Sequence, residues 1–222
     1  MNKKIIYFLS LIVLCNILIS QKSKDIEIIE KPIEYNQERT RLSIEYLKER
    51  HGIIQKTPSI IPKIIVLHYT GGGTIKTNFN YFNSTQIENA RKMNKDQSLL
   101  NVSAHYLIDR DGTIYHLVDD NLLARHTIGL NYCSIGVENI GSKQEPLTDK
   151  QVLANAKLIR HLCKKHKIEY VIGHSEYIKF RKTKLWKESN PNYITYKEDP
   201  GNQFLINVRK LIADLNLKTK PE

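Results

Sequence analysis

One apolar run, at residues 61–69, constrains the fold of this chain more than any other part of the sequence. It reads IPKIIVLHY, is rich in β-branched residues, and is followed by the glycines Gly71 to Gly73. A compact apolar run that ends at turn residues is typical of a strand buried on both faces of a sheet. Other elements of the chain must therefore cover this strand.

Strand-like and helix-like segments alternate along the rest of the chain. The pattern predicts strands at Val102–Asp109, Thr113–Val118, Ser134–Ile140 and Ile168–Gly173. It predicts helices at Asn36–His51, from Thr148 to about His166, and from Asn202 to about Leu217. The Asp111-Gly112 pair favours a tight hairpin turn. Strands interleaved with helices indicate a layered α/β or α+β domain, and 222 residues suit one such domain with extensions.

The net charge narrows the class of partner. The chain carries 34 Lys and Arg against 23 Asp and Glu, a formal charge of +11, while 41% of its residues are hydrophobic. This composition is typical of a globular protein, and three cysteines are too few for a disulfide scaffold. A basic surface favours a polyanionic partner, which charge alone leaves open among nucleic acid, acidic lipid and acidic wall polymer.

The first twenty residues have the pattern of a secretory signal. Lys3 and Lys4 precede an apolar run at 5–19, and polar residues follow from Ser20. The run is short for a membrane span, but its end is a poor cleavage signal, so a retained N-terminal anchor stays open, as does a lipoprotein form at Cys15. We expect export to the periplasm or cell envelope, or secretion. Cleavage removes two lysines and no acid, which leaves +9.

Three side chains stand where elements are expected to end. His68 closes the first strand, His174 follows the 168–173 strand, and Asp199 precedes the last helix. Two imidazoles and a carboxylate are a common ligand set for catalytic zinc, which keeps a fourth position for water. The alternative is that the histidines are ordinary polar residues and Asp199-Pro200-Gly201 is a plain turn, since no HExxH or CxxC motif is present.

Two further groups are candidates for acid–base and electrostatic roles. Glu138 lies in an otherwise apolar strand, where burial would raise its pKa towards that of a general base. Lys197, two residues before Asp199, could place a cation near a developing oxyanion. A solvent-facing strand residue and a solvated loop lysine are the respective alternatives. The remaining cysteines, Cys133 and Cys163, are expected to be buried free thiols.

At this point a family resemblance is visible. The segments IIVLHYTGGG, VSAHYLIDRDGTIYHLVDDNLLARHTIGLNYCSIGVENIG and VIGHSEY followed by DPGNQF occur in this order. Together they resemble the zinc-dependent N-acetylmuramoyl-L-alanine amidases of amidase type 2, the family that also includes the peptidoglycan recognition proteins. The resemblance covers about residues 61–206. It implies a mixed β-sheet of about five or six strands flanked by helices, with one zinc ion in a surface groove.

The resemblance also implies roles residue by residue. His68, His174 and Asp199 match the zinc ligands, Glu138 matches the catalytic glutamate, and Lys197 matches the residue that stabilises the oxyanion. His126 and Asn131 match groove positions near the substrate that are not metal ligands in the family, and Tyr69 is a further expected substrate contact. The segment at 180–196 departs from compact members of the family. Its Trp186 is a further candidate for substrate contact, unless the segment folds back as a packed loop.

The implied organisation is a signal or anchor at 1–20, a helical lead-in and linker at 21–60, a zinc amidase domain at 61–217 and a tail at 218–222. The implied activity is hydrolysis of the amide between N-acetylmuramic acid and L-alanine in peptidoglycan or its fragments. The alternative is a non-catalytic exported protein that binds muropeptides. We expect a monomer, no nucleic-acid partner, and membrane contact only through a retained N-terminal segment.

Overall fold

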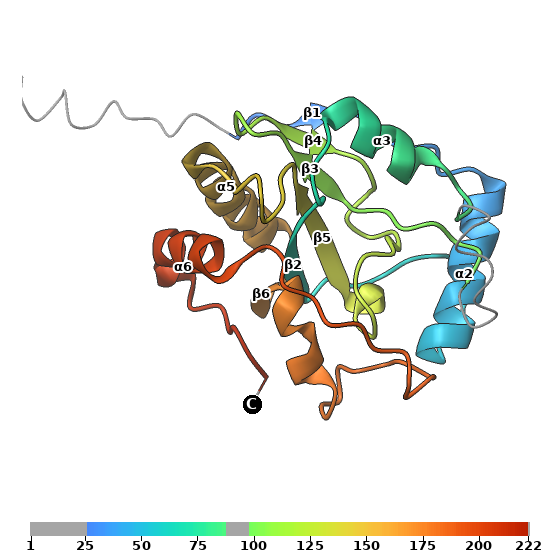
Figure 1. Cartoon of the computed structure of the whole chain (residues 1–222). Coiled ribbons are helices and arrows are strands. Elements are labelled where there is room, and N and C mark those ends of the chain that lie inside the picture. The colour runs from blue at the N-terminus through green and yellow to red at the C-terminus, as the bar shows by residue number, and fades with distance from the viewer. Residues whose placement is uncertain (1–25, 88–97, 222) are drawn as a thin grey trace, which may run out of the picture.

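The computed structural model describes residues 26–87 and 98–221, which form a six-stranded mixed sheet with helices on both sides (Figure 1). The predicted signal at 1–20 lies outside the described residues. The strands are β1 (Ile29–Glu30), β2 (Ile64–Tyr69), β3 (Tyr106–Ile108), β4 (Ile114–His116), β5 (Ser134–Asn139) and β6 (Tyr170–Gly173). Their order is β1-β4-β3-β5-β2-β6, and only the β3–β4 pairing is antiparallel. The predicted mixed α/β sheet is confirmed.

The helical elements flank this sheet. They are α2 (Gln37–His51), α3 (Ile75–Asn83), α5 (Asp149–Lys165) and α6 (Asn202–Leu211), with short 3-10 turns η1 (Asn131–Cys133), η2 (His174–Phe180) and η3 (Ala213–Leu215). In Figure 1, α5 and α6 lie together on one side of the sheet, and α2 and α3 lie on the other. None of the helices in the described ranges has the length and apolar character needed to cross a bilayer.

Strand β2 is buried on both faces, as the run at 61–69 predicts. Ile65 and Leu67 pack in the cluster that includes α5 and α6, whereas Ile64 and Val66 pack in the opposite cluster with η2. Side chains alternate between the two faces of a strand. His68 therefore continues the face of Ile64 and Val66, which is the face opposite α5 and α6.

The N-terminal helix α2 begins and ends at the residues the sequence indicates. The side chain of Asn36 accepts a hydrogen bond from the Arg39 amide, and Gly52 ends the helix with a left-handed φ of 65°. Leu42, Tyr46 and Leu47 are buried in a shared cluster with residues from the loops of the domain. The helix is thus packed against the sheet-containing body.

Several predicted elements differ in length. The strand predicted at 102–109 is ordered as β-ladder only at 106–108, because the Ser103 amide pairs with the carbonyl of Arg125 in a loop. The last helix ends at Leu211 and tightens into η3, where Asn216 is left-handed. Helix α3 and strand β1 were not predicted. The start of α3 uses Thr74 and Thr77 as a capping box, a variant without the usual Glu or Gln.

Both remaining cysteines are free, and their burial differs from the prediction in one case. Cys133 is buried, with burial raising the pKa of its thiol to about 12. Cys163 is only half-buried, because it lies at the edge of the face that α5 turns to the core. Neither thiol is ionised at neutral pH.

A buried carboxylate, Asp120, ties the end of α5 to the sheet. It is 2% exposed and accepts hydrogen bonds from the Tyr106 hydroxyl at 2.6 Å, Lys165 Nζ at 2.8 Å and His166 Nε2 at 2.9 Å. Burial alone would raise the pKa of Asp120, but these hydrogen bonds outweigh it and lower the pKa to about 2.

We expect Asp120→Asn to lower the free energy of unfolding by about 3 kcal/mol at pH 7. The reason is that Tyr106, Lys165 and His166 would lose the charged acceptor of their hydrogen bonds. The unfolded-state pKa of Asp is about 3.9. The stabilisation by Asp120 is therefore complete above about pH 5 and is lost as the pH falls towards 2. In urea unfolding, the difference in free energy of unfolding between the variant and the wild type should be smaller at pH 3 than at pH 7. The exposed neighbour Asp119→Asn is the control, and an equal difference at both pH values would contradict the role.

Candidate metal centre

Parallel pairing brings the predicted site residues to one edge of the sheet. Strand β2 pairs with β6 so that Leu67 lies opposite Gly173. His68 follows Leu67 and His174 follows Gly173, so the two histidines lie side by side. On its other side β2 pairs with β5, where His68 lies opposite Glu138. Asp199 lies in a loop. The Ser175 amide donates a hydrogen bond to the backbone carbonyl of Asp199, at 2.9 Å, and holds this loop in place.

Three buried ligand atoms form a nearly equilateral triangle. His68 Nδ1 is 3.0 Å from His174 Nδ1 and 3.2 Å from Asp199 Oδ2, and His174 Nδ1 is 3.1 Å from the same oxygen. A tetrahedral ion with bonds of about 2.0–2.1 Å has ligand atoms about 3.3 Å apart. The triangle therefore has the size of one face of a tetrahedral site, and the three residues could hold a metal ion.

The charge state of the ligands also suits a cation. Burial, followed by the nearby His68, lowers the pKa of His174 to about 4, so this imidazole is neutral at pH 7. Burial alone would raise the pKa of Asp199, but its close contacts with the His174 and His68 imidazoles hold that pKa well below its usual range. The site thus presents two nitrogens and one carboxylate oxygen, the donor set that zinc prefers.

One carboxyl oxygen of Glu138 has no hydrogen-bond partner in the described part of the chain. Its Oε2 is buried and makes no hydrogen bond to any described residue. Burial raises the pKa of Glu138 to about 7, the neighbouring His68 lowers it, and Asp199 raises it again. A cation in the triangle would lower this pKa. In either case the unpaired Oε2 is available to exchange a proton.

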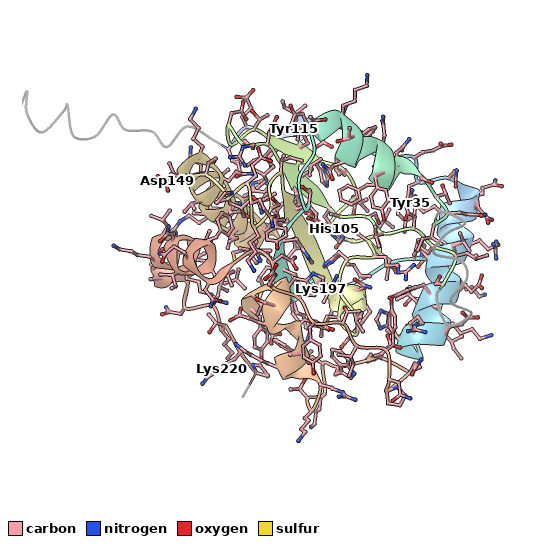
Figure 2. The ribbon with its side chains drawn as sticks, viewed as in Figure 1. Tyr35, His105, Tyr115, Asp149, Lys197 and Lys220 are labelled. Atoms are coloured by element: carbon pink, nitrogen blue, oxygen red, sulfur yellow. The ribbon has the colours of Figure 1, made fainter. Side chains whose placement is uncertain are left out.

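These groups open onto one cavity of about 320 Å³. Seven of the predicted residues line it and are thus brought together: His68, Tyr69, His126, Glu138, His174, Lys197 and Asp199. Lys197 is exposed, and its label lies near the centre of the view in Figure 2. Arg125 and Asn78 also line the cavity and were not predicted. The position of Arg125 directly before His126 was the available signal.

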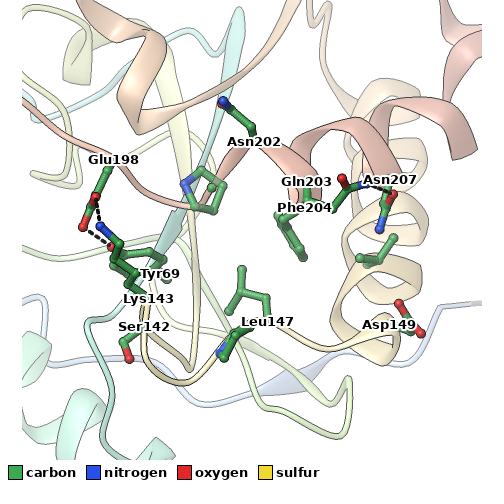
Figure 3. Close-up of a pocket in the computed structure, with 14 residues that line it drawn as sticks. Tyr69, Ser142, Lys143, Leu147, Asp149, Glu198, Asn202, Gln203, Phe204 and Asn207 are labelled. Carbon is green, nitrogen blue, oxygen red and sulfur yellow. Dashed lines mark hydrogen bonds and ion pairs between the residues drawn. The ribbon is translucent and has the colours of Figure 1, made fainter.

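A second cavity of about 390 Å³ adjoins the first (Figure 3). Tyr69 borders both cavities. Along the extended segment before α6, Lys197 and Asp199 line the metal cavity, whereas Glu198 and Pro200 line the second one. At their shared edge Glu198 accepts a hydrogen bond from the Tyr69 hydroxyl at 3.4 Å and pairs with Lys143 at 3.1 Å. A ligand that extends past Tyr69 would enter the second cavity.

Two predicted substrate contacts are placed elsewhere. Asn131 is fully buried: its Oδ1 accepts hydrogen bonds from the amides of His126 and Thr127, and its Nδ2 donates to the Tyr46 hydroxyl. Trp186 is not among the residues that line the metal cavity; its ring stacks on Tyr177 at 5.9 Å. The geometry of Asn131 is that of a buried structural residue.

The segment at 180–196 folds back as a packed loop. The Lys187 amide donates to the carbonyl of Gly129 at 3.0 Å, and the Ser189 amide donates to the carbonyl of Arg50 in α2 at 2.9 Å. Glu188 forms a buried ion pair with the Arg50 guanidinium at 3.1 Å. The loop is therefore anchored to the C-terminal end of α2. Of its aromatic residues, Tyr196 is 93% exposed.

Comparison with known proteins identifies relatives of this chain. The sequence profile of amidase type 2, described as N-acetylmuramoyl-L-alanine amidase, matches residues 55–202. The structure of the N-acetylmuramoyl-L-alanine amidase LysC from Clostridium intestinale URNW is 21% identical, with a TM-score of 0.52, over 86% of this chain and 99% of that chain. A selenomethionine derivative of AmpD is 23% identical, with a TM-score of 0.54, over 84% and 94%. These two structures show the fold, and no curated protein sequence matches significantly.

The anchoring of the loop can be tested with its single tryptophan. Gly129 has a φ of +76°, and a Cβ there would lie 2.7 Å from the Trp186 ring. We expect Gly129→Ala to expel the indole, shift its fluorescence to longer wavelength, and destabilise the protein by about 2 kcal/mol.

Gly52→Ala is the matched control, because Gly52 has a φ of +65° but nothing within 4 Å of an added Cβ. It should cost about 1 kcal/mol from backbone strain alone and leave the emission unchanged. Equal emission spectra of the two variants would contradict the packing of Trp186 on Gly129.

Proposed function

The chain belongs to the amidase type 2 family of N-acetylmuramoyl-L-alanine amidases, and from this premise we propose that it hydrolyses the amide between N-acetylmuramic acid and L-alanine with one zinc ion per chain. Its substrate is peptidoglycan or peptidoglycan fragments. The observation that carries the proposal is the buried triangle of His68, His174 and Asp199 with the unpartnered acid of Glu138 in the same cavity.

Zinc held by these three residues would lower the pKa of a bound water to about 7 and polarise the scissile carbonyl. Glu138 accepts the proton of the attacking water and delivers it to the nitrogen of the leaving amine. Burial raises the pKa of Glu138, which favours uptake of the proton, and the nearby cation favours its return. Because Oε2 makes no hydrogen bond to a described residue, none has to be broken when it binds that water.

Lys197 lines the same cavity as the ligand triangle. In the transition state the carbonyl oxygen gains negative charge, and a cation beside it stabilises that charge more than it stabilises the neutral amide. Tyr69 and His126 line the cavity as well, and Tyr69 is the one that a long substrate meets at the second cavity.

A non-catalytic muropeptide-binding protein is the rival function. What favours catalysis is the complete donor set together with Glu138, since binding alone requires neither a closed ligand triangle nor a buried acid. We propose that the protein acts in the cell envelope after export. The excess of Lys and Arg over Asp and Glu supports affinity for anionic wall material.

Glu138→Gln should remove most turnover and leave zinc bound. We expect a loss of about 10²–10⁴-fold in kcat, because the amide cannot carry the proton. Mass spectrometry of peptidoglycan incubated with the zinc-loaded mature chain measures turnover through free peptides that begin with L-alanine. Zinc content by elemental analysis should stay at one per chain in the variant, whereas Asp199→Ala should lose it. Full activity of Glu138→Gln would sink the assigned role, and no products from the wild type would favour the binding protein.

Lys197→Met is expected to lower kcat by about 10²-fold with a small change in KM, because the lost interaction forms mainly in the transition state. Lys197→Arg keeps a cation and should recover part of the rate. The exposed lysine of the neighbouring ion pair, Lys143→Met, is the control, since it lines the second cavity and not the metal cavity. A rise in KM at constant kcat would instead make Lys197 a binding residue.

A further inference from the structure

Behind the metal ligands lies another imidazole, and its hydrogen bonds determine the tautomer of His68. On the side of His68 away from the triangle, its Nε2 is 3.1 Å from Nδ1 of His126. The two rings meet edge to face, with centroids 5.1 Å apart and planes at 88°. A neutral hydrogen bond between two imidazoles needs one nitrogen to donate and the other to accept. The question is which of the two carries the hydrogen.

The surroundings of His126 answer it. Its other nitrogen, Nε2, faces the carbonyl oxygen of Ser134 at 3.4 Å and the Ser134 hydroxyl at 3.3 Å. The carbonyl can only accept. The hydroxyl donates its own hydrogen to the carbonyl of Leu130 at 2.9 Å, so towards His126 it also accepts. Nε2 of His126 therefore carries the hydrogen, and Nδ1 of His126 presents a lone pair.

The lone pair on His126 Nδ1 makes His68 Nε2 the donor. The Thr127 hydroxyl lies 3.0 Å from the same Nδ1 and can share its lone pair, but a His68 Nε2 without a hydrogen would still face that lone pair at 3.1 Å. With its hydrogen on Nε2, His68 has a lone pair on Nδ1, the atom that faces His174 and Asp199. The other tautomer would point an N–H at the metal position.

We infer that His126 is a positioning residue: it accepts the Nε2 hydrogen of His68 and thereby fixes the tautomer and ring orientation that bind the metal. This inference deepens the proposed function and rests on it. Hydrogen-bond partners of metal-ligating histidines typically contribute 10- to 100-fold to metal affinity. His126 also lines the cavity, but the role assigned here acts through His68 and needs no contact with substrate.

The surrounding residues hold His126 in place. A Cβ at Gly136 would lie 2.6 Å from the His126 ring, so only glycine leaves room for the imidazole there. The amides of His126 and Thr127 both donate to Asn131 Oδ1, at 2.9 and 2.7 Å. The motif residues of this region therefore act together: Asn131, Ser134 and Gly136 all contact His126 or its backbone and hold its ring behind His68.

The first experiment compares zinc affinity in His126→Leu and His126→Asn by competition with a chelator at fixed pH. Leucine removes the acceptor, and we expect affinity to fall by at least 10-fold. Asparagine can place Oδ1 where Nδ1 accepts, and should stay within about 3-fold of wild type. His161→Leu, on α5 and remote from the ligand triangle, is the matched control and should bind like wild type. Long-range proton–nitrogen NMR spectra of the wild type should show His68 as the Nε2–H tautomer.

Unchanged zinc affinity in His126→Leu would overturn the inference, as would an Nδ1–H tautomer of His68. Equal losses in the leucine and asparagine variants would also overturn it, since they would make the role one of packing. If the leucine variant does not fold, Gly136→Ala replaces it and should weaken zinc binding by displacing the ring. Absence of zinc binding in the wild type would be the failure of the proposed function itself, which is distinct from these outcomes.

Discussion

The site depends on the register of three parallel strands. Because β6, β2 and β5 run in the same direction, their carboxyl ends meet at one edge of the sheet. The pairing of His68 with Glu138 and of Leu67 with Gly173 brings together two proposed ligands, His68 and His174, and the proposed proton acceptor. A shift of β2 by one residue would turn His68 towards α5 and α6 and break the triangle. The burial of β2 on both faces prevents that shift. Ile65 and Leu67 pack in one core cluster, and Ile64 and Val66 pack in the cluster on the opposite face. Hydrophobic packing thus fixes the position of a polar centre.

Burial then sets the chemistry of the groups that the strands assemble. Loss of water raises the pKa of Glu138 to about 7 and lowers that of His174 to about 4, so this imidazole is neutral at pH 7. Asp199 is an exception, because its contacts with His174 and His68 hold its pKa well below its usual range and keep it ionised. One cavity therefore holds a neutral imidazole, a carboxylate and a carboxyl group with a raised pKa, which is the charge pattern that the proposed mechanism uses.

Sequence patterns predicted the elements that carry strong local signals and missed those that do not. The caps of α2 and α5, and the doubly buried β2, follow from Asn36, Gly52, Thr148 and the run at 61–69. Helix α3 was missed because its capping box has Thr77 where the usual pattern has Glu or Gln. His68 and His174 were predicted because they stand at strand ends, Asp199 because it precedes the last helix, and Glu138 because it lies in an apolar strand. Arg125 had only the weak signal of its position before His126, and the burial of Asn131 had none, since both depend on tertiary folding.

The loop at 180–196 shows why the sequence left its role open. Its Trp186, Tyr193 and lysines are equally consistent with an exposed binding segment and with a packed one, because local composition does not say what lies opposite. The structure supplies Gly129 and the C-terminal end of α2 as the surfaces it covers. Helix α2 begins before the region that matches the family profile, yet its Arg50 anchors this loop, and its Tyr46 bonds to Asn131, which holds the backbone of His126. Through these contacts a helix outside the matched region supports the backbone of His126, whose ring contacts His68.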